Sequence, residues 1–127
     1  MEVYVKSAGA LFGLLSVILG AFAAHRLKRM VPKPVMESME TGIRYMMYHA
    51  AVLLILGFNL NFDSYGQRMS ALCLILGVFL FSFSIFGLCW GMVSQLDTRF
   101  LGPVTPIGGL FLIVGWVLLL VQFASGF

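Results

Sequence analysis

The chain has 127 residues, of which 61% are hydrophobic and only 10% are charged, and its net charge is +3. A soluble domain carries about 25% charged residues, so this composition excludes an ordinary soluble protein, whose surface needs more polar side chains. The basic residues adjoin apolar runs, which makes the anionic surface of a membrane a better partner than nucleic acid.

Four apolar runs follow one another along the chain, and none of them contains Asp, Glu, Lys or Arg. Each is about 18 residues or longer, enough to cross a hydrocarbon core of roughly 30 Å as a helix. A helix satisfies its own backbone hydrogen bonds in lipid, whereas barrel strands would alternate in polarity. We predict an all-α membrane protein, a single four-helix transmembrane domain with both termini on the same side and helices at about 7–24, 35–62, 69–93 and 106–124.

Small residues follow one face of the first helix. Because lipid supplies no hydrophobic force between helices, close packing uses such residues, which are Gly9, Gly13, Ser16, Gly20 and Ala24. The third helix carries Ser70, Cys73, Gly77, Ser84, Gly87 and Gly91, and the fourth carries Gly108 and Gly115. We expect contacts within one bundle, although Gly9–Gly13 and Gly87–Gly91 could instead join two copies of the chain as a homo-oligomer.

Most basic residues fall in the connector after the first helix, which holds Arg26, Lys28, Arg29, Lys33 and Arg44. With Arg99 in the third connector, six basic residues lie on one side of the membrane, whereas Lys6 and Arg68 lie on the other. The positive-inside rule then predicts that the first and third connectors are cytoplasmic and that the termini are outside. The same cluster argues that the first helix is retained, although Ala21-Phe22-Ala23 also fits a signal cleavage site.

The second helix holds the sharpest candidate for chemistry, His49. Thr41, Tyr45 and His49 lie at steps of four on one face, with Tyr48 beside them, so they form an intramembrane polar cluster. An ionisable residue inside a membrane is a functional hypothesis by default. The alternative, which we favour, is a neutral imidazole that bonds a neighbouring helix, because no intramembrane carboxylate is present to pair with it.

The fourth helix is expected to begin at Thr105-Pro106, with Thr105 as the N-cap. A helix N-terminus attracts anions, and glycine leaves room for a phosphate to reach the backbone. We therefore predict an anionic lipid headgroup site at the cytoplasmic face. It combines the start of the fourth helix with the basic end of the first, through His25, Arg26, Lys28, Arg29, Thr105, Gly108 and Gly109.

Four segments together resemble a known family, the YgdD-like group of small inner-membrane proteins, catalogued as domain of unknown function 423. They are Gly20 to Lys28, Thr41 to Ala50, Phe81 to Ser84 and, most specifically, Leu101 to Gly109 running on to Gly115-Trp116. The family usually has glycine where this chain has Ala23, Arg26 and Phe83. The resemblance implies a four-helix protein of the bacterial cytoplasmic (inner) membrane, and it implies no activity.

No sequence pattern indicates an enzyme: there is no glycine-rich phosphate loop before a lysine and no zinc motif. Metal binding by His25 and His49 would need further ligands, and the methionines, which can bind Cu(I), are more often apolar filling. We predict no metal and no cofactor. The sequence favours a non-enzymatic protein that interacts with lipids or other membrane proteins; the alternative is a small transporter or channel that uses the cluster around His49.

Overall fold

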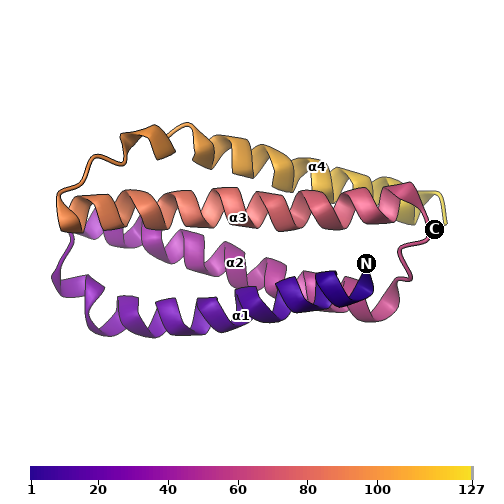
Figure 1. The fold of residues 1–127 in the computed structure, drawn as a ribbon, viewed down its shortest axis with the longest axis horizontal. Helices are drawn as coiled ribbons and strands as arrows, with labels where there is room; N and C mark the ends of the chain where they lie inside the picture. The colour runs from indigo at the N-terminus through magenta and orange to yellow at the C-terminus, as the bar shows by residue number, and fades with distance from the viewer. Residues whose placement is uncertain (127) are drawn as a thin grey trace.

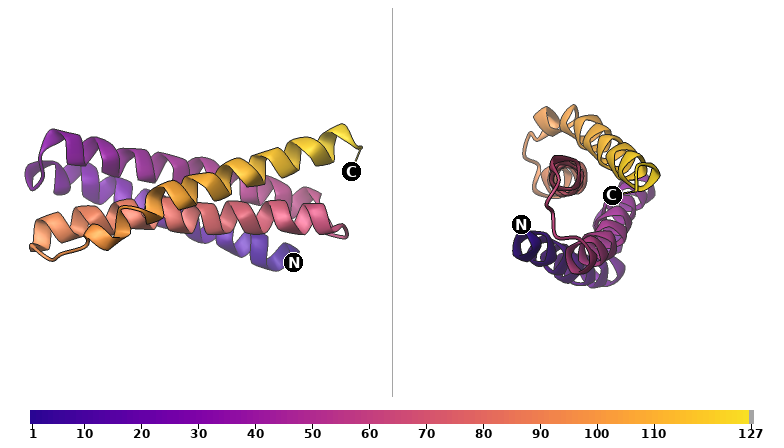
Figure 2. Two further views of the ribbon diagram at one scale, coloured as in Figure 1. Left: turned by 90° about the horizontal axis from the view of Figure 1, so that it is seen from above. Right: turned by 90° about the vertical axis from the view of Figure 1, so that its right-hand side faces the viewer.

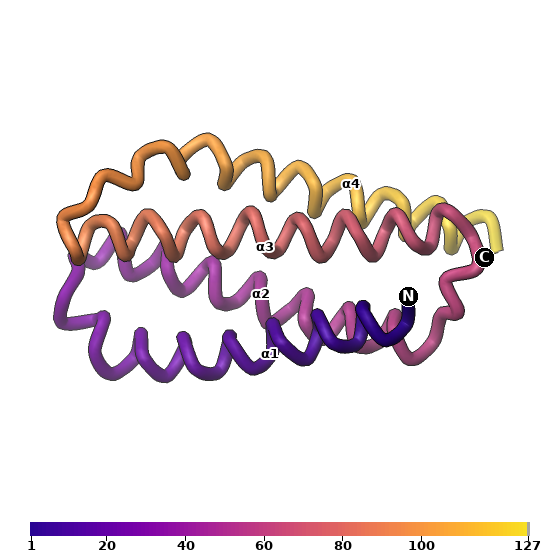
Figure 3. Tube along the Cα trace, in the orientation of Figure 1, coloured from indigo at the N-terminus to yellow at the C-terminus, as the bar shows by residue number. Residues whose placement is uncertain are grey.

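Four long helices account for most of residues 1–126, the part of the chain that the structure describes. In the computed structural model they are α1 (Glu2–His25), α2 (Lys33–Asn59), α3 (Tyr65–Ser94) and α4 (Val104–Ala124), with single 3-10 turns at η1 (Leu27–Arg29) and η2 (Arg99–Leu101) (Figure 1). All four helices are long and apolar enough to cross a membrane. Both termini and the α2–α3 connector lie at one end, and the other two connectors lie at the opposite end (Figure 3). The predicted fold is confirmed.

The bundle is built from two helical hairpins. α1 packs along α2, α3 packs along α4, and α2 against α3 makes the main contact between the hairpins. The outer helices, α1 and α4, do not pack against each other, and the end view in Figure 2 shows them on different sides of the bundle. The backbones of α2 and α4 also stay apart, so any link between these two helices depends on side chains.

Glycines allow the closest helix contacts, as predicted for the first helix. A Cβ on Gly9 would meet the carbonyl oxygen of Ala50 on α2 at 3.0 Å, and one on Gly77 would meet Leu112 of α4 at 2.7 Å. The expected intramolecular contacts are therefore present for these residues. The prediction that Gly87 and Gly91 lie at a helix–helix contact is wrong, because both face the third connector, through Leu101 and Thr98.

Several helix limits differ from the predicted ones. α1 begins at Glu2 rather than near residue 7, α2 ends at Asn59, and α3 already begins at Tyr65. The Ser64 hydroxyl caps α3 by accepting from the Gln67 amide at 3.2 Å. Arg68 Nε donates to the carbonyl of Phe62, which has a φ of 58°, at 2.7 Å. These bonds hold the tight second connector, residues 60–64, which lies earlier in the chain than the predicted connector at 63–68.

The start of α4 also corrects the sequence prediction. The helix begins at Val104, with Pro103 in the cap position, so Thr105 is not the N-cap. Its hydroxyl instead lies 2.5 Å from the Ser84 hydroxyl, across the α3–α4 contact. Ser84 also donates to the carbonyl of Phe81 at 2.9 Å, which leaves Thr105 to donate to Ser84. Thr105, which was expected to cap the start of α4, therefore links α3 and α4.

Candidate functional site

A hydrogen bond between side chains of α2 and α4 joins the two hairpins. Trp116 Nε1 lies 3.0 Å from His49 Nε2, and His49 Nδ1 lies 2.7 Å from the carbonyl oxygen of Tyr45. The indole N–H can only donate, so Nε2 of His49 accepts and Nδ1 carries the hydrogen that Tyr45 accepts. His49 is 7% exposed, and both ring nitrogens are engaged as a neutral imidazole.

Aromatic rings surround this bond. The rings of Tyr45 and Phe81 are 5.2 Å apart, and Trp116 meets His49 edge-on at 5.9 Å. The ring centroids of Tyr48 and Tyr45 are 6.1 Å apart, and both tyrosines are about half exposed on the outside of the bundle. The structure thus brings the predicted cluster together and adds Trp116 and Phe81, which spacing along α2 could not reveal.

Thr41 is the fourth member of the predicted cluster. It lies about one helical turn from Tyr45 and two from His49, toward the end of the bundle with the first and third connectors. Its hydroxyl donates to the carbonyl of Glu37 at 3.0 Å and accepts a long, 3.5 Å bond from Arg44 Nη2. It therefore belongs to a different surface from His49, the groove described next.

A groove of about 520 Å³ separates α2 from α4 near this end, and α3 forms its floor. We call it the α2–α4 groove; it is lined by Val35, Ser38, Thr41, Ile85, Leu88, Cys89, Met92, Gly102, Thr105 and Pro106. Most of the lining is apolar, and the hydroxyls of Ser38, Thr41 and Thr105 border it. The groove exists because α2 and α4 each pack on α3 and not directly on each other.

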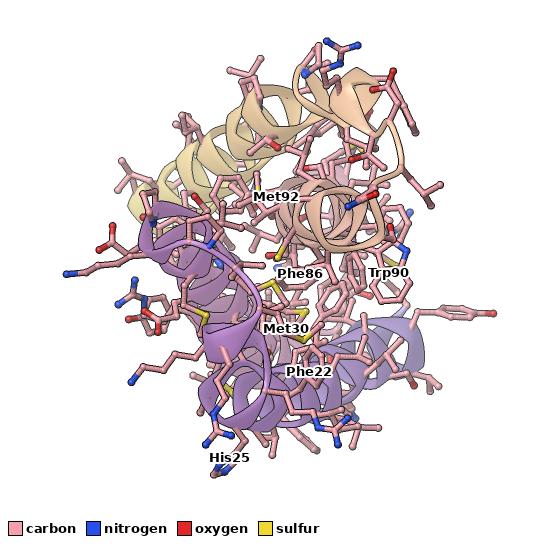
Figure 4. The ribbon with its side chains drawn as sticks, turned by 90° about the vertical axis from the view of Figure 1, so that its left-hand side faces the viewer. Phe22, His25, Met30, Phe86, Trp90 and Met92 are labelled. Carbon is pink, nitrogen blue, oxygen red and sulfur yellow. The ribbon has the colours of Figure 1, made fainter. Side chains whose placement is uncertain are left out.

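The predicted headgroup residues occupy two separate places at that end. In Figure 4, which views this end, α4 lies above α3 and α1 below it, with His25 pointing away from the bundle. Arg26, Lys28 and Arg29 are likewise exposed beside α1. Gly108 is buried against the backbone of Phe81, so its missing side chain makes room for α3 and not for a phosphate. The structure does not bring the basic residues of the first connector to the start of α4.

Within residues 1–126, no three His, Cys, Asp or Glu side chains gather into a metal-binding group. His25 lies at the end of α1, whereas His49 is bonded within the bundle to Tyr45 and Trp116. The two histidines therefore do not form a shared centre.

A family model described as "Protein of unknown function (DUF423)" matches residues 19–109 of this chain. The chain belongs to the DUF423 family. The match, which confirms the family that the motifs indicated, includes His49 and the whole α2–α4 groove, whereas Trp116 lies beyond it.

Relatives of this DUF423 chain carry the description "UPF0382 membrane protein". One from Schizosaccharomyces pombe is 39% identical, over 92% of this chain and 98% of its own length. One from Staphylococcus haemolyticus is 37% identical, over 90% and 89%, and YwdK of Bacillus subtilis is 35% identical, over 95% of each. No solved structure matches. The chain is thus an integral membrane protein of a family whose biochemical role is not established.

The bond between His49 and Trp116 predicts a measurable coupling between the hairpins. His49→Leu and Trp116→Phe should each lower the free energy of unfolding by about 1 kcal/mol, and the double variant should lose little more, because membrane hydrogen bonds contribute about 0.6–1.7 kcal/mol. His49→Gln should be tolerated, since its amide oxygen can accept from the indole. Unfolding in mixed micelles measures all four.

Trp90→Phe is the matched control, because Trp90 is also exposed, at 63%, but lies on α3 away from His49. It should show no coupling with His49→Leu. Additive losses for His49 and Trp116 would contradict the bond. Loss of a cellular phenotype in both His49 variants, at unchanged stability, would instead assign His49 a functional role.

Proposed function

We propose that this protein is a non-enzymatic membrane protein that binds an anionic phospholipid in the α2–α4 groove. The observation that carries the proposal is the groove itself, an apolar trough of about 520 Å³ bordered by hydroxyls at the end of the bundle that has most of the basic residues. A phospholipid likewise has an apolar part and a polar part, since its acyl chains are apolar and its phosphate needs charged or polar partners.

The apolar part of the groove suits acyl chains. Val35, Ile85, Leu88 and Met92 contribute hydrocarbon or thioether surface from α2 and α3. Because α2 and α4 leave the groove open along its side, a lipid could enter from the bilayer without passing through the bundle.

Arg44 supplies the charge for the headgroup from the edge of the groove. It borders a separate hollow between α1 and α2, and it reaches the α2–α4 groove through its bond to Thr41, which lines it. Its guanidinium has five N–H donors, and the one bond that it makes, to Thr41, is long at 3.5 Å. Arg99, the other nearby candidate, is paired with Asp97 at 3.1 Å, and this hydrogen bond lowers the pKa of the Asp97 carboxyl. Arg44 therefore keeps more of its donors for a phosphate, which an arginine can bind through two parallel bonds.

The exposed basic residues of the first connector have a less specific role in this proposal. Arg26, Lys28 and Arg29 attract an anionic leaflet by about 1 kcal/mol each near the surface. They raise the local concentration of anionic lipid at the end where the groove lies. We place this end at the cytoplasmic face of a bacterial cytoplasmic membrane, on the count of basic residues.

A transporter or channel that uses His49 is less well supported. Both nitrogens of His49 are engaged in hydrogen bonds, which leaves the ring no free site for a proton or substrate in this state. The acidic residues, Glu2, Glu37, Glu40, Asp63 and Asp97, lie in the connectors or near the helix ends. A proton-coupled exporter of cations would instead need a carboxylate inside the membrane.

Retention of lipid through purification tests the proposal. Native mass spectrometry should detect one anionic phospholipid on the unmutated protein. Arg44→Gln should reduce it about tenfold, because a charge-assisted hydrogen bond contributes about 1.5 kcal/mol or more. Ser38→Trp should reduce it as well, by filling the groove from an exposed position.

Two variants serve as matched controls. Arg29→Gln removes the same charge from the same end, and Ser94→Trp changes an exposed serine whose hydroxyl, like that of Ser38, bonds the carbonyl four residues back. Both should retain the lipid. Equal losses of lipid in Arg44→Gln and Arg29→Gln would show that lipid is held by general attraction to the basic surface and not by the groove. Absence of retained lipid in the unmutated protein would also refute the site.

A further inference from the structure

We propose that Met30, Met39 and Cys89 form a binding site for one Cu(I) ion. The three residues line a second hollow of about 280 Å³, on the other side of α3 from α4, which we call the sulfur pocket. Its lining is Leu19, Phe22, Leu27, Met30, Met39, Phe86, Cys89, Trp90 and Val93. Cys89 also borders the α2–α4 groove, but this inference does not require a lipid to bind there.

The sulfur atoms come from three separate elements. Met30 follows η1, Met39 lies on α2 and Cys89 lies on α3. Met39 and Cys89 are 4% and 5% exposed and pack in one buried cluster, which also contains Met36. The fold thus gathers residues that are up to 59 positions apart (from 30 to 89) around one hollow.

The type of ligand selects the metal. Thioether sulfur is a soft ligand that favours Cu(I), whereas Zn²⁺ is bound by thiolates, imidazoles and carboxylates, and this pocket offers one thiol only. None of the nine residues that line the sulfur pocket has a carboxylate, imidazole or hydroxyl side chain to offer a harder ion. Methionine side chains are flexible and can adjust to a coordination geometry at low cost.

The charge also balances in this apolar setting. Cu(I) binds as the Cys89 thiol releases its proton to water, so a copper–sulfur bond forms and a sulfur–hydrogen bond breaks without any redox change. One thiolate and two neutral thioethers leave the bound ion with no net charge. A divalent ion on the same ligands would keep a net positive charge, which is costly away from water.

Met30 gives the ion a route into the pocket. Its residue is 54% exposed, and Figure 4 shows its side chain reaching inward from the first connector toward Phe86, at the mouth between α1 and α3. Phe22 and Trp90 flank the same opening. A half-exposed methionine can receive the ion at the rim and then hold it together with Met39 and Cys89 behind it.

Competition with bicinchoninate, under ascorbate and in detergent, tests the site with Cu(I) alone. The unmutated protein should bind one Cu(I) per chain. Cys89→Ser, Met39→Leu and Met30→Leu should each weaken binding at least about tenfold, since even changes behind a metal ligand cost 10–100-fold. X-ray absorption of the Cu(I) form should show sulfur ligands only.

Cys73→Ser and Met92→Leu are the matched controls, because both residues lie on α3 and neither lines the sulfur pocket. Their Cu(I) affinity should stay within about twofold of the unmutated value. Met30→Leu keeps the test valid if a core variant fails to fold, because Met30 lies in a connector. No binding, binding unchanged by the three pocket variants, or an equal loss in Cys73→Ser would overturn the proposal.

Discussion

Alanine in place of Gly108 should disrupt the α3–α4 hairpin, whereas alanine in place of the neighbouring Gly109 should be tolerated. A Cβ on Gly108 would overlap the backbone nitrogen of Phe81 and lie 2.7 Å from its Cα. A Cβ on Gly109 would meet only the side chain of Phe81, at the ordinary contact distance of 3.8 Å. A rigid backbone cannot move aside as a side chain can, so α4 itself must shift.

The expected loss for Gly108→Ala is about 3 kcal/mol in the free energy of unfolding, at the upper end for overpacked cores. Both changes gain the same helix propensity, so the difference between the two variants isolates the contact with Phe81. Unfolding in mixed micelles measures it. Equal stability of the two variants would contradict the close α3–α4 packing. Because Gly108 has this structural role, its variants cannot report on lipid binding.

Labelling of introduced cysteines from outside the cell should show which connectors face outward, because a cysteine on the outer face reacts and one on the cytoplasmic face does not. In a variant that lacks Cys73 and Cys89, cysteine introduced at Asp63 in the second connector should react with an impermeant thiol reagent. Cysteine introduced at Leu96 in the third connector should not, because six basic residues favour a cytoplasmic location for the first and third connectors. Both positions are exposed, and neither change removes a basic residue.

Asp63 is a better probe than the adjacent Ser64, whose hydroxyl caps α3. Permeabilised cells provide the control, since both cysteines should then react. Labelling at position 96 alone in intact cells would reverse the orientation, and it would place the α2–α4 groove and the sulfur pocket outside the cell.

Much of the fold could be predicted because lipid imposes simple rules on a sequence. Runs of about 18 apolar residues must form helices in a bilayer, and an even number of crossings returns the chain to its starting side. Gly9 also indicated a close helix contact, since a small residue serves that purpose wherever its partner is. Helix ends were less predictable, because Ser64 and Arg68 hold the second connector through local hydrogen bonds.

The candidate sites depended on which helices become neighbours, and hydropathy carries no such information. His49 was identified as an unusual intramembrane residue, but its partner Trp116 is 67 positions away on α4. The predicted headgroup site joined the ends of α1 and α4 because both lie at the same end of the bundle, yet the two helices do not pack together.

By itself, the sequence determined that this is a four-helix membrane protein with its termini together and six of its eight basic residues at the opposite end, because burial in lipid depends on local composition. Only the tertiary structure decided that α2 and α4 stand apart to leave a groove, and that Met30, Met39 and Cys89 meet around one pocket. The physical reason is that helix pairing depends on the fit of small and large side chains across each contact. Hydropathy shows that each helix can enter lipid, but it does not show which helix each one packs against.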